Sequence, residues 1–201
     1  MESKIIAIII GIIVLGSIFI ISYRAAPEKK VLHIIKKAPD FELLNQDNET
    51  ISSDQLLGKV KVMSFIYTSC EMPNMCPRTT KNFRRLQESL GEELGGRTVL
   101  ILVSFDPERD TLGMLKKYGE LYGADFSNWH FLGGDEEAIE KILDEYEIIA
   151  ERQDDETFRH SMIALLIDRD NNVRKMYLMN KWEPEGIRKD IVTLLGESDE
   201  A

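Results

Sequence analysis

Two apolar runs rich in strand-forming residues, 60–67 and 98–105, constrain the fold of this chain more than any other feature. Such runs are typical of strands buried inside a sheet. Between them lies a helical pattern that begins at Pro77, where a first helical residue belongs, and carries Phe83, Leu86 and Leu90 on one face. A strand, a helix and a second strand in this order indicate an α/β domain.

The rest of the chain continues this alternation and ends in a hairpin. The predicted elements are a helix over 111–122, a strand over 129–132, a helix capped by Asp135 that runs to 146, strands over 162–167 and 173–177, and a helix over 183–195. Together they predict a mixed central sheet flanked by helices. In such sheets sites form where strands end and helices begin. The segment from Cys70 to Cys76 and Asp106 both occupy such places.

The N-terminus carries an apolar run, residues 5–21, in which Ser17 is the only polar side chain. At 1.5 Å per residue, the stretch from 5 to 23 reaches about 28 Å, close to the thickness of the hydrocarbon layer. Cleavage after Ala25 or Ala26 would place Tyr23 or Arg24 at a position that needs a small residue. We therefore expect an uncleaved transmembrane helix that contacts the bilayer through residues 5–23.

These features divide the chain into a membrane anchor (1–24), a charged linker (25–38), one folded domain (39–196) and an acidic tail (197–201). Basic residues are more numerous after the apolar run than before it, and the positive-inside rule alone would keep the domain in the cytoplasm. A long translocated domain often ignores that rule. The residues alone leave the orientation open.

The charge of the chain argues against binding of nucleic acid. It has 35 acidic and 25 basic residues, a formal net charge of -10. Binding of a phosphate backbone rests on clusters of Lys and Arg, and the sequence contains no basic stripe and no Gly-rich phosphate loop. The acidic surface is interpreted as a solvated one.

Cys70 and Cys76 are the only cysteines, and both lie in one predicted strand-to-helix loop. Cys76 precedes Pro77 and is predicted to be the N-cap, where free N–H groups and the helix dipole favour a thiolate. A thiolate is both a nucleophile and a soft metal ligand. The alternative is a structural disulfide, which would constrain little of the unfolded chain across so short a segment.

His160, which opens the predicted strand 162–167, is the histidine expected nearest to the cysteines. Two thiolates and an imidazole suit a copper site of low coordination number, whereas structural zinc needs a fourth ligand that is not evident. His33 and His130 are interpreted as structural. Met72 and Met75 could add weak thioether contacts, but we favour a role in covering the site.

Four stretches resemble the SCO/SenC family of copper-binding proteins of cytochrome oxidase assembly. They are APDFELLNQDNETISSDQLLGKVKVMSFIYTSC (38–70), the Cys-Pro at 76–77, VSFDPERDT (103–111) and HSMIALLIDRDNNV (160–173). The resemblance extends from Pro39 to about Leu195. It implies a thioredoxin-like fold, an N-terminal anchor and a domain outside the cytoplasmic membrane.

The resemblance also implies the roles of single residues. Cys70, Cys76 and His160 would be the copper ligands, and Asp106 would tune the site or act as a turn cap, two roles that we weigh equally. Arg109 and Asp110 are expected to form a local ion pair and a helix cap. Five residues separate the cysteines here, whereas three are usual in the family.

The resulting hypothesis is a membrane-anchored metallochaperone that helps to assemble the binuclear copper site of cytochrome c oxidase. Its expected partners are a copper donor protein and the copper-bearing oxidase subunit. The alternative is a thiol:disulfide oxidoreductase that uses Cys70 and Cys76 as a redox pair and does not need His160. A peroxide-reducing enzyme is the third hypothesis, and it would require a different local motif around one cysteine.

Overall fold

The computed structural model describes residues 31–153, 157–179 and 181–197. The chain divides into two compact units, Met1–Val31 and Leu32–Ala201, and every described helix and strand belongs to the second. The predicted membrane anchor (1–24) and residues 25–30 of the predicted linker lie outside the described residues. None of the described helices combines the length and apolar character that crossing a membrane requires.

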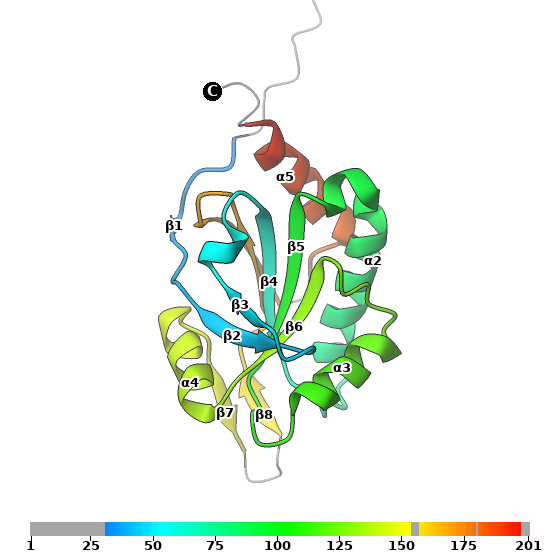
Figure 1. The fold of residues 1–201 in the computed structure, drawn as a ribbon, viewed down its shortest axis with the longest axis vertical. Helices are drawn as coiled ribbons and strands as arrows, with labels where there is room; N and C mark the ends of the chain where they lie inside the picture. Colours follow the sequence, from blue (N-terminus) through cyan, green and yellow to red (C-terminus); the bar gives the residue numbers. More distant parts are fainter. Residues whose placement is uncertain (1–30, 154–156, 180, 198–201) are drawn as a thin grey trace, which may run out of the picture. The chain divides into compact units, whose positions relative to one another are not determined.

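An eight-stranded mixed sheet forms the centre of the domain, in the order β1-β10-β9-β4-β5-β6-β2-β3 (Figure 1). The central strands β4, β5 and β6 are parallel, and β9 and β2 run antiparallel to their neighbours β4 and β6. The strands are β1 (Lys36–Lys37), β2 (Glu42–Asn45), β3 (Thr50–Ser52), β4 (Val60–Ile66), β5 (Thr98–Ser104), β6 (Trp129–Gly133), β9 (Ile163–Ile167) and β10 (Asn172–Leu178).

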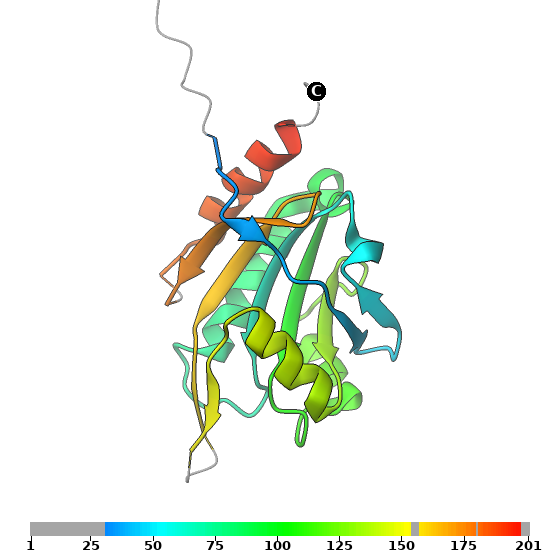
Figure 2. The same cartoon turned by 90° about the vertical axis from the view of Figure 1, so that its left-hand side faces the viewer.

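Helices cover both faces of this sheet. The α-helices in the described residues are α2 (Cys76–Gly95), α3 (Leu112–Leu121), α4 (Glu136–Glu145) and α5 (Pro184–Gly196), and η1 (Asp54–Leu56) is a short 3-10 turn. Figures 1 and 2 show α2, α3 and α5 on one face and α4 on the other. Phe83 of α2 packs against Trp182, which precedes α5, with ring centroids 6.0 Å apart.

The core is centred on β4 and β5, in which all seven residues of each strand are buried. This burial explains why both strands read as apolar runs in the sequence. The one charged residue in these two strands is Lys61 of β4, a fully buried lysine. Its ammonium group donates a long hydrogen bond of 3.4 Å to the carbonyl of Leu56.

A separate two-stranded sheet, β7 (Ala150–Arg152) and β8 (Phe158–His160), projects from the end of the domain where β4 and β5 terminate (Figures 1 and 2). Its register pairs Ala150 with His160 and Arg152 with Phe158. Sequence reasoning did not predict this hairpin. It placed His160 at the opening of β9, whereas His160 ends β8.

The predicted α/β class, with a mixed central sheet flanked by helices, is confirmed. Every predicted helix and strand after residue 59 is present, with bounds shifted by a few residues. The strands β1, β2 and β3 were not predicted. β1 lies inside the predicted linker 25–38 and pairs with β10, and the buried Leu32 accepts a hydrogen bond of 2.6 Å from Arg174.

Candidate metal centre

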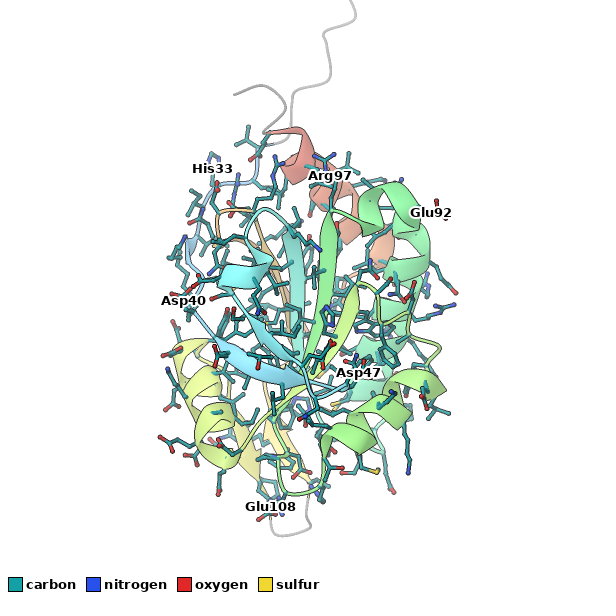
Figure 3. All side chains as sticks on the ribbon, in the orientation of Figure 1. His33, Asp40, Asp47, Glu92, Arg97 and Glu108 are labelled. Atoms are coloured by element: carbon teal, nitrogen blue, oxygen red, sulfur yellow. The ribbon has the colours of Figure 1, made fainter. Side chains whose placement is uncertain are left out.

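The candidate site lies where β4 and β5 end and the hairpin β7–β8 begins. The loop after β4 carries Cys70 and leads into α2 at Cys76, the loop after β5 carries Asp106, and β8 ends at His160. In Figure 3, Glu108 of the β5–α3 loop marks this end of the domain, and His33 lies at the opposite end. Three segments distant in sequence therefore meet at one edge of the sheet.

The two cysteines are buried and carry free thiols. Their side chains hydrogen-bond to each other. The structural disulfide considered as an alternative is thus not formed in this structure. The backbone of Cys76 is fixed by Thr80. The Thr80 hydroxyl donates to the Cys76 carbonyl at 2.9 Å and also contacts the Tyr118 hydroxyl at 3.0 Å.

The hydrogen bond between the two thiols shifts their pKa values in opposite directions. The thiol of Cys76 donates to Cys70 and, together with the N–H groups of Cys76 and Met72, lowers the pKa of Cys70 to about 4, against the opposing effect of burial. The same hydrogen bond, burial and the neighbouring negative charge raise the pKa of Cys76. Two adjacent thiols share one proton in this way.

The structure corrects the predicted start of the helix, in which Cys76 was the N-cap. The helix begins with Cys76 itself, and Met75 is the N-cap residue. The free N–H of Cys76 therefore points to the sulfur of Cys70, which lies just outside the helix. Backbone N–H groups at the helix N-terminus act to lower the pKa of both cysteines, so the predicted stabilisation of a negative charge there reaches the two sulfurs.

His160 presents one defined nitrogen to the sulfurs. Its Nδ1 lies 3.0 Å from the carbonyl oxygen of Ser161. Because a carbonyl only accepts, Nδ1 is the donor, and in the neutral ring the lone pair is then on Nε2. Nε2 lies 3.8 Å from Sγ of Cys76. A carbonyl that fixes the tautomer is a common feature of metal-binding histidines.

Aromatic side chains form the wall behind the imidazole. The ring centroid of Phe105 lies 5.0 Å and that of Tyr67 lies 5.9 Å from the ring of His160. Phe158 contacts both of these rings, at 5.2 and 5.1 Å. Burial and a hydrogen bond to Cys70 raise the pKa of Tyr67. The wall excludes water from one side of the histidine and strengthens polar contacts there.

Asp106 lies on the far side of this wall, fully buried. Its carboxylate pairs with Arg109 at 2.5 Å and with Arg152 of β7 at 3.1 Å. Both guanidinium groups lie over the ring of Phe158, at 5.8 and 5.4 Å. The predicted ion pair of Arg109 is present, with Asp106 as its partner. The influence of Asp106 on the site stays a prediction.

Asp110 is not a helix cap, which corrects the sequence-based expectation. Thr111 is the N-cap of α3, and its side chain accepts from the N–H of Met114. The Asp110 carboxylate instead accepts hydrogen bonds from Ser104 and from both the N–H and the hydroxyl of Thr68, two residues before Cys70. Burial raises the pKa of Asp110, and these donors oppose the shift.

The other sequence candidates lie apart from the sulfurs. His33 is exposed in the N-terminal segment, and His130 is on β6, where burial lowers its pKa. Met75 packs against the core and Met72 is 41% exposed, an arrangement that fits the predicted covering role. Among the described residues, no three His, Cys, Asp or Glu side chains already surround one metal position. The two thiols and the imidazole are in contact with one another instead.

The donor set determines what this site can do chemically. Two sulfurs and an imidazole nitrogen with a fixed lone pair are soft and borderline ligands, and these suit Cu(I) and Cu(II) better than hard cations. The same two sulfurs can be oxidised to a disulfide. Sequence reasoning missed Tyr67, Phe158 and Arg152 and gave Asp110 another role, since their contacts arise from the packing of three separate segments.

Comparison with known proteins places the chain in a family. The SCO1/SenC family model matches residues 33–196. The SCO1 protein homolog of Bacillus subtilis is 34% identical over 141 residues, which cover 68% of this chain and 71% of that protein.

Two solved structures show the same fold. Bradyrhizobium japonicum ScoI with copper bound has 26% sequence identity and a TM-score of 0.68, and the match covers 79% of this chain and 99% of that one. BsSco, described as having a disulfide switch and as a member of the Sco family of cytochrome c oxidase assembly proteins, has 28% identity and a TM-score of 0.71 over 82% and 97% of the two chains. With this fold, this set of side chains and this extent of matching, the chain belongs to the SCO1/SenC family.

Proposed function

We propose that this chain binds copper through Cys70, Cys76 and His160 and assists assembly of the binuclear copper site of cytochrome c oxidase. The observation that carries the proposal is the mutual contact of these three side chains, with the lone pair of His160 Nε2 directed at the sulfurs. A relative with the same fold binds copper.

The side chains are prepared for a soft cation in two ways. The pKa of Cys70 is lowered without any metal, which favours the loss of its proton when copper binds. The carbonyl of Ser161 holds Nδ1 and leaves Nε2 as the ligand. Copper is cargo here, received from a donor protein and passed to the copper-bearing oxidase subunit.

We also place the domain outside the cytoplasmic membrane, anchored by a helix over residues 5–23. The support is the apolar run, which is long enough to span the hydrocarbon layer. Protease treatment of intact spheroplasts should release the domain if it is extracytoplasmic. Protection of the domain until the membrane is lysed would contradict this location.

The experiment for copper binding is titration of the full chain, purified in detergent with reduced thiols, with Cu(I) and Cu(II). We expect one copper per chain, and a loss of Cu(II) affinity in His160→Ala. His33→Ala is the matched control, because it removes an exposed histidine at the other end of the domain. Stoichiometry clearly below one, or binding untouched by His160→Ala, would reject the proposal.

A second candidate function, thiol:disulfide exchange, is favoured by the low pKa of Cys70. Its thiolate would attack a substrate disulfide and form a mixed disulfide, which Cys76 would then attack. The products would be a Cys70–Cys76 disulfide and a substrate dithiol that has gained the two electrons and two protons lost by the cysteines. The reaction needs no imidazole ligand. Reductase activity that survives His160→Ala but not Cys76→Ser would therefore support it over copper binding.

A further inference from the structure

The turn from Asp106 to Asp110 supplies none of the three proposed ligands, yet it contacts both segments that carry them. Its own shape is fixed by the carbonyl of Asp106, which accepts from the N–H groups of Arg109 at 3.2 Å and Asp110 at 2.9 Å. The Ser104 hydroxyl links its two ends, because it contacts the Asp106 N–H at 3.2 Å and the Asp110 carboxylate at 2.5 Å. The two carboxylates thus belong to one compact unit.

One carboxylate of this turn holds the histidine hairpin. Arg152, on β7, pairs with Asp106 at 3.1 Å and with Glu108 at 2.6 Å. It lies opposite Phe158, two residues before His160, and its guanidinium covers the Phe158 ring. Asp106 is fully buried, and loss of one partner of a buried ion pair is strongly destabilising because it leaves an uncompensated charge. The pair therefore fixes the position of His160, the last residue of β8.

The other carboxylate holds the cysteine loop. Asp110, which is 4% exposed, accepts the Thr68 N–H at 2.9 Å and also the Thr68 hydroxyl. Thr68 follows the last residues of β4 and precedes Cys70 by two positions. Two hydrogen bonds to one residue set both its backbone and its side chain, so they determine the direction in which the loop leaves the strand.

Building on the copper-binding function proposed above, we infer that the Asp106–Asp110 turn is a bracket that sets the distance between the cysteine loop and the histidine. Arg152 and Asp110 are its positioning residues, one for each side. Neither touches the reacting atoms. The bracket explains why two acidic residues, four apart and both buried, lie beside a site that neither enters.

The histidine side is tested with Arg152→Gln in the full chain. Loss of a residue that orients a metal ligand costs about 10- to 100-fold in metal affinity. We expect a loss in that range for Cu(II), an altered Cu(II) electron paramagnetic resonance spectrum, and partial recovery of both in Arg152→Lys. Arg159→Gln is the matched control, because Arg159 lies on the same hairpin beside His160 but pairs on the surface with Glu151.

A double-mutant cycle separates positioning from general damage. If Arg152 acts through Asp106, the second substitution should cost nothing further. The double variant Asp106→Asn with Arg152→Gln should then have the same Cu(II) affinity as whichever single variant binds Cu(II) less tightly. Losses that multiply, or equal losses in Arg152→Gln and Arg159→Gln, would overturn the bracket on this side.

The cysteine side is tested with Thr68→Val and Asp110→Asn. We expect faster hydrogen exchange of the Thr68 amide in Asp110→Asn, and a loss of Cu(I) affinity of about 10-fold in both variants with the Cu(II)–histidine spectrum retained. Thr68→Val keeps the buried carboxylate and its bond to the Thr68 N–H, so it serves if Asp110→Asn fails to fold. An unchanged Cu(I) affinity in folded Thr68→Val would overturn this side.

Hydrogen exchange also distinguishes failure of the bracket from failure of the proposed function. Arg152→Gln should accelerate exchange of the β7–β8 amides in the absence of copper, and Arg159→Gln should not. If the wild-type chain bound no copper but this difference appeared, the bracket would stand and the copper proposal would fall. If the wild-type chain bound copper but Arg152→Gln and Arg159→Gln showed the same β7–β8 exchange rates, the copper proposal would stand and the bracket would fall.

Discussion

The two cysteines and the histidine lie in contact, but structurally different parts of the domain position them. The cysteine segment lies between β4, with seven buried residues, and the first turn of the long helix α2. The histidine ends a three-residue strand in a sheet of only two strands, whose burial is partial. The cysteines are thus positioned by the core of the domain, and the histidine by a few side-chain contacts.

This difference assigns separate roles to the two regions. Backbone hydrogen bonds, core packing and the two bonds from Thr68 to Asp110 fix the cysteines, so single substitutions at other places outside the loop should move them little. The histidine depends on Phe158, on Arg152 and on the bond from the Ser161 N–H to the Ile149 carbonyl at 2.8 Å. Substitutions at these places should change how the imidazole meets the sulfurs while the domain stays folded.

The largest effect is expected in Cys76→Ala. It removes one sulfur and also the hydrogen bond that is the main cause of the low pKa of Cys70. We expect the Cu(I) affinity to fall by more than about 100-fold, beyond the range for residues outside the ligand set. His160→Ala should cost less Cu(I) affinity, because thiolates hold Cu(I) best. Competition with a chromophoric Cu(I) chelator measures both.

Met72→Ala is the control for this prediction, since Met72 lies in the same loop with an exposed side chain. Its Cu(I) affinity should stay within about three-fold of wild type. Equal losses in Cys76→Ala and His160→Ala would show that the two regions contribute alike to Cu(I), contrary to the comparison.

A smaller and local effect is expected in Phe158→Ala. Truncation of a buried phenylalanine costs about 3 kcal/mol. Because this ring packs the hairpin against Tyr67 and Phe105, the loss should concentrate in the hairpin, where amide exchange should accelerate by about 100-fold while β4 and β5 change less. Hydrogen exchange with residue resolution provides the measurement.

Phe41→Ala is the matched control, because Phe41 and Phe158 are equally buried at 8% exposure. Phe41 lies before β2 and lines a groove with Ile142 of α4, away from the hairpin. It should lower the global stability without a selective change in β7–β8. A uniform change across the domain in Phe158→Ala would mean that the hairpin is an integral part of the core.

The same contrast explains how much the sequence could predict. Strands β4 and β5 were predicted because burial on both faces demands apolar residues along their whole length. β7 and β8, with the sequences AER and FRH, have too few residues for any period to appear. Their pairing depends on Phe158 and Arg152 meeting a turn about 50 residues earlier, and such contacts leave no local signal.

The candidate site was predicted in its members but not in its details. The mutual contact of Cys70, Cys76 and His160 agrees with their choice as candidates, although their role as copper ligands is still a prediction. The predicted N-cap was wrong by one residue, because local signals place a helix start only to within a residue or two.

The smallest of the three effects concerns Lys61, which lies in β4 below the cysteine loop. Burial, partly offset by Asp168, lowers the pKa of Lys61 to about 8. The folded state thus binds this proton less tightly than the unfolded state, whose lysines titrate near 10.5. Stability should therefore rise between about pH 8 and 10.5 and carry the full penalty below pH 8.

Lys61→Met should remove this penalty and raise the free energy of unfolding at pH 7 by about 2 kcal/mol. The carbonyl of Leu56 keeps a donor, because the N–H of Lys59 also reaches it at 3.2 Å. The exposed neighbour in Lys59→Met is the control, with an expected change within about 0.5 kcal/mol. Denaturant unfolding at pH 7 and pH 10 measures both. Because the gain belongs to the core, local opening of β7–β8 should be unchanged, and a parallel gain there would show that the two regions unfold as one.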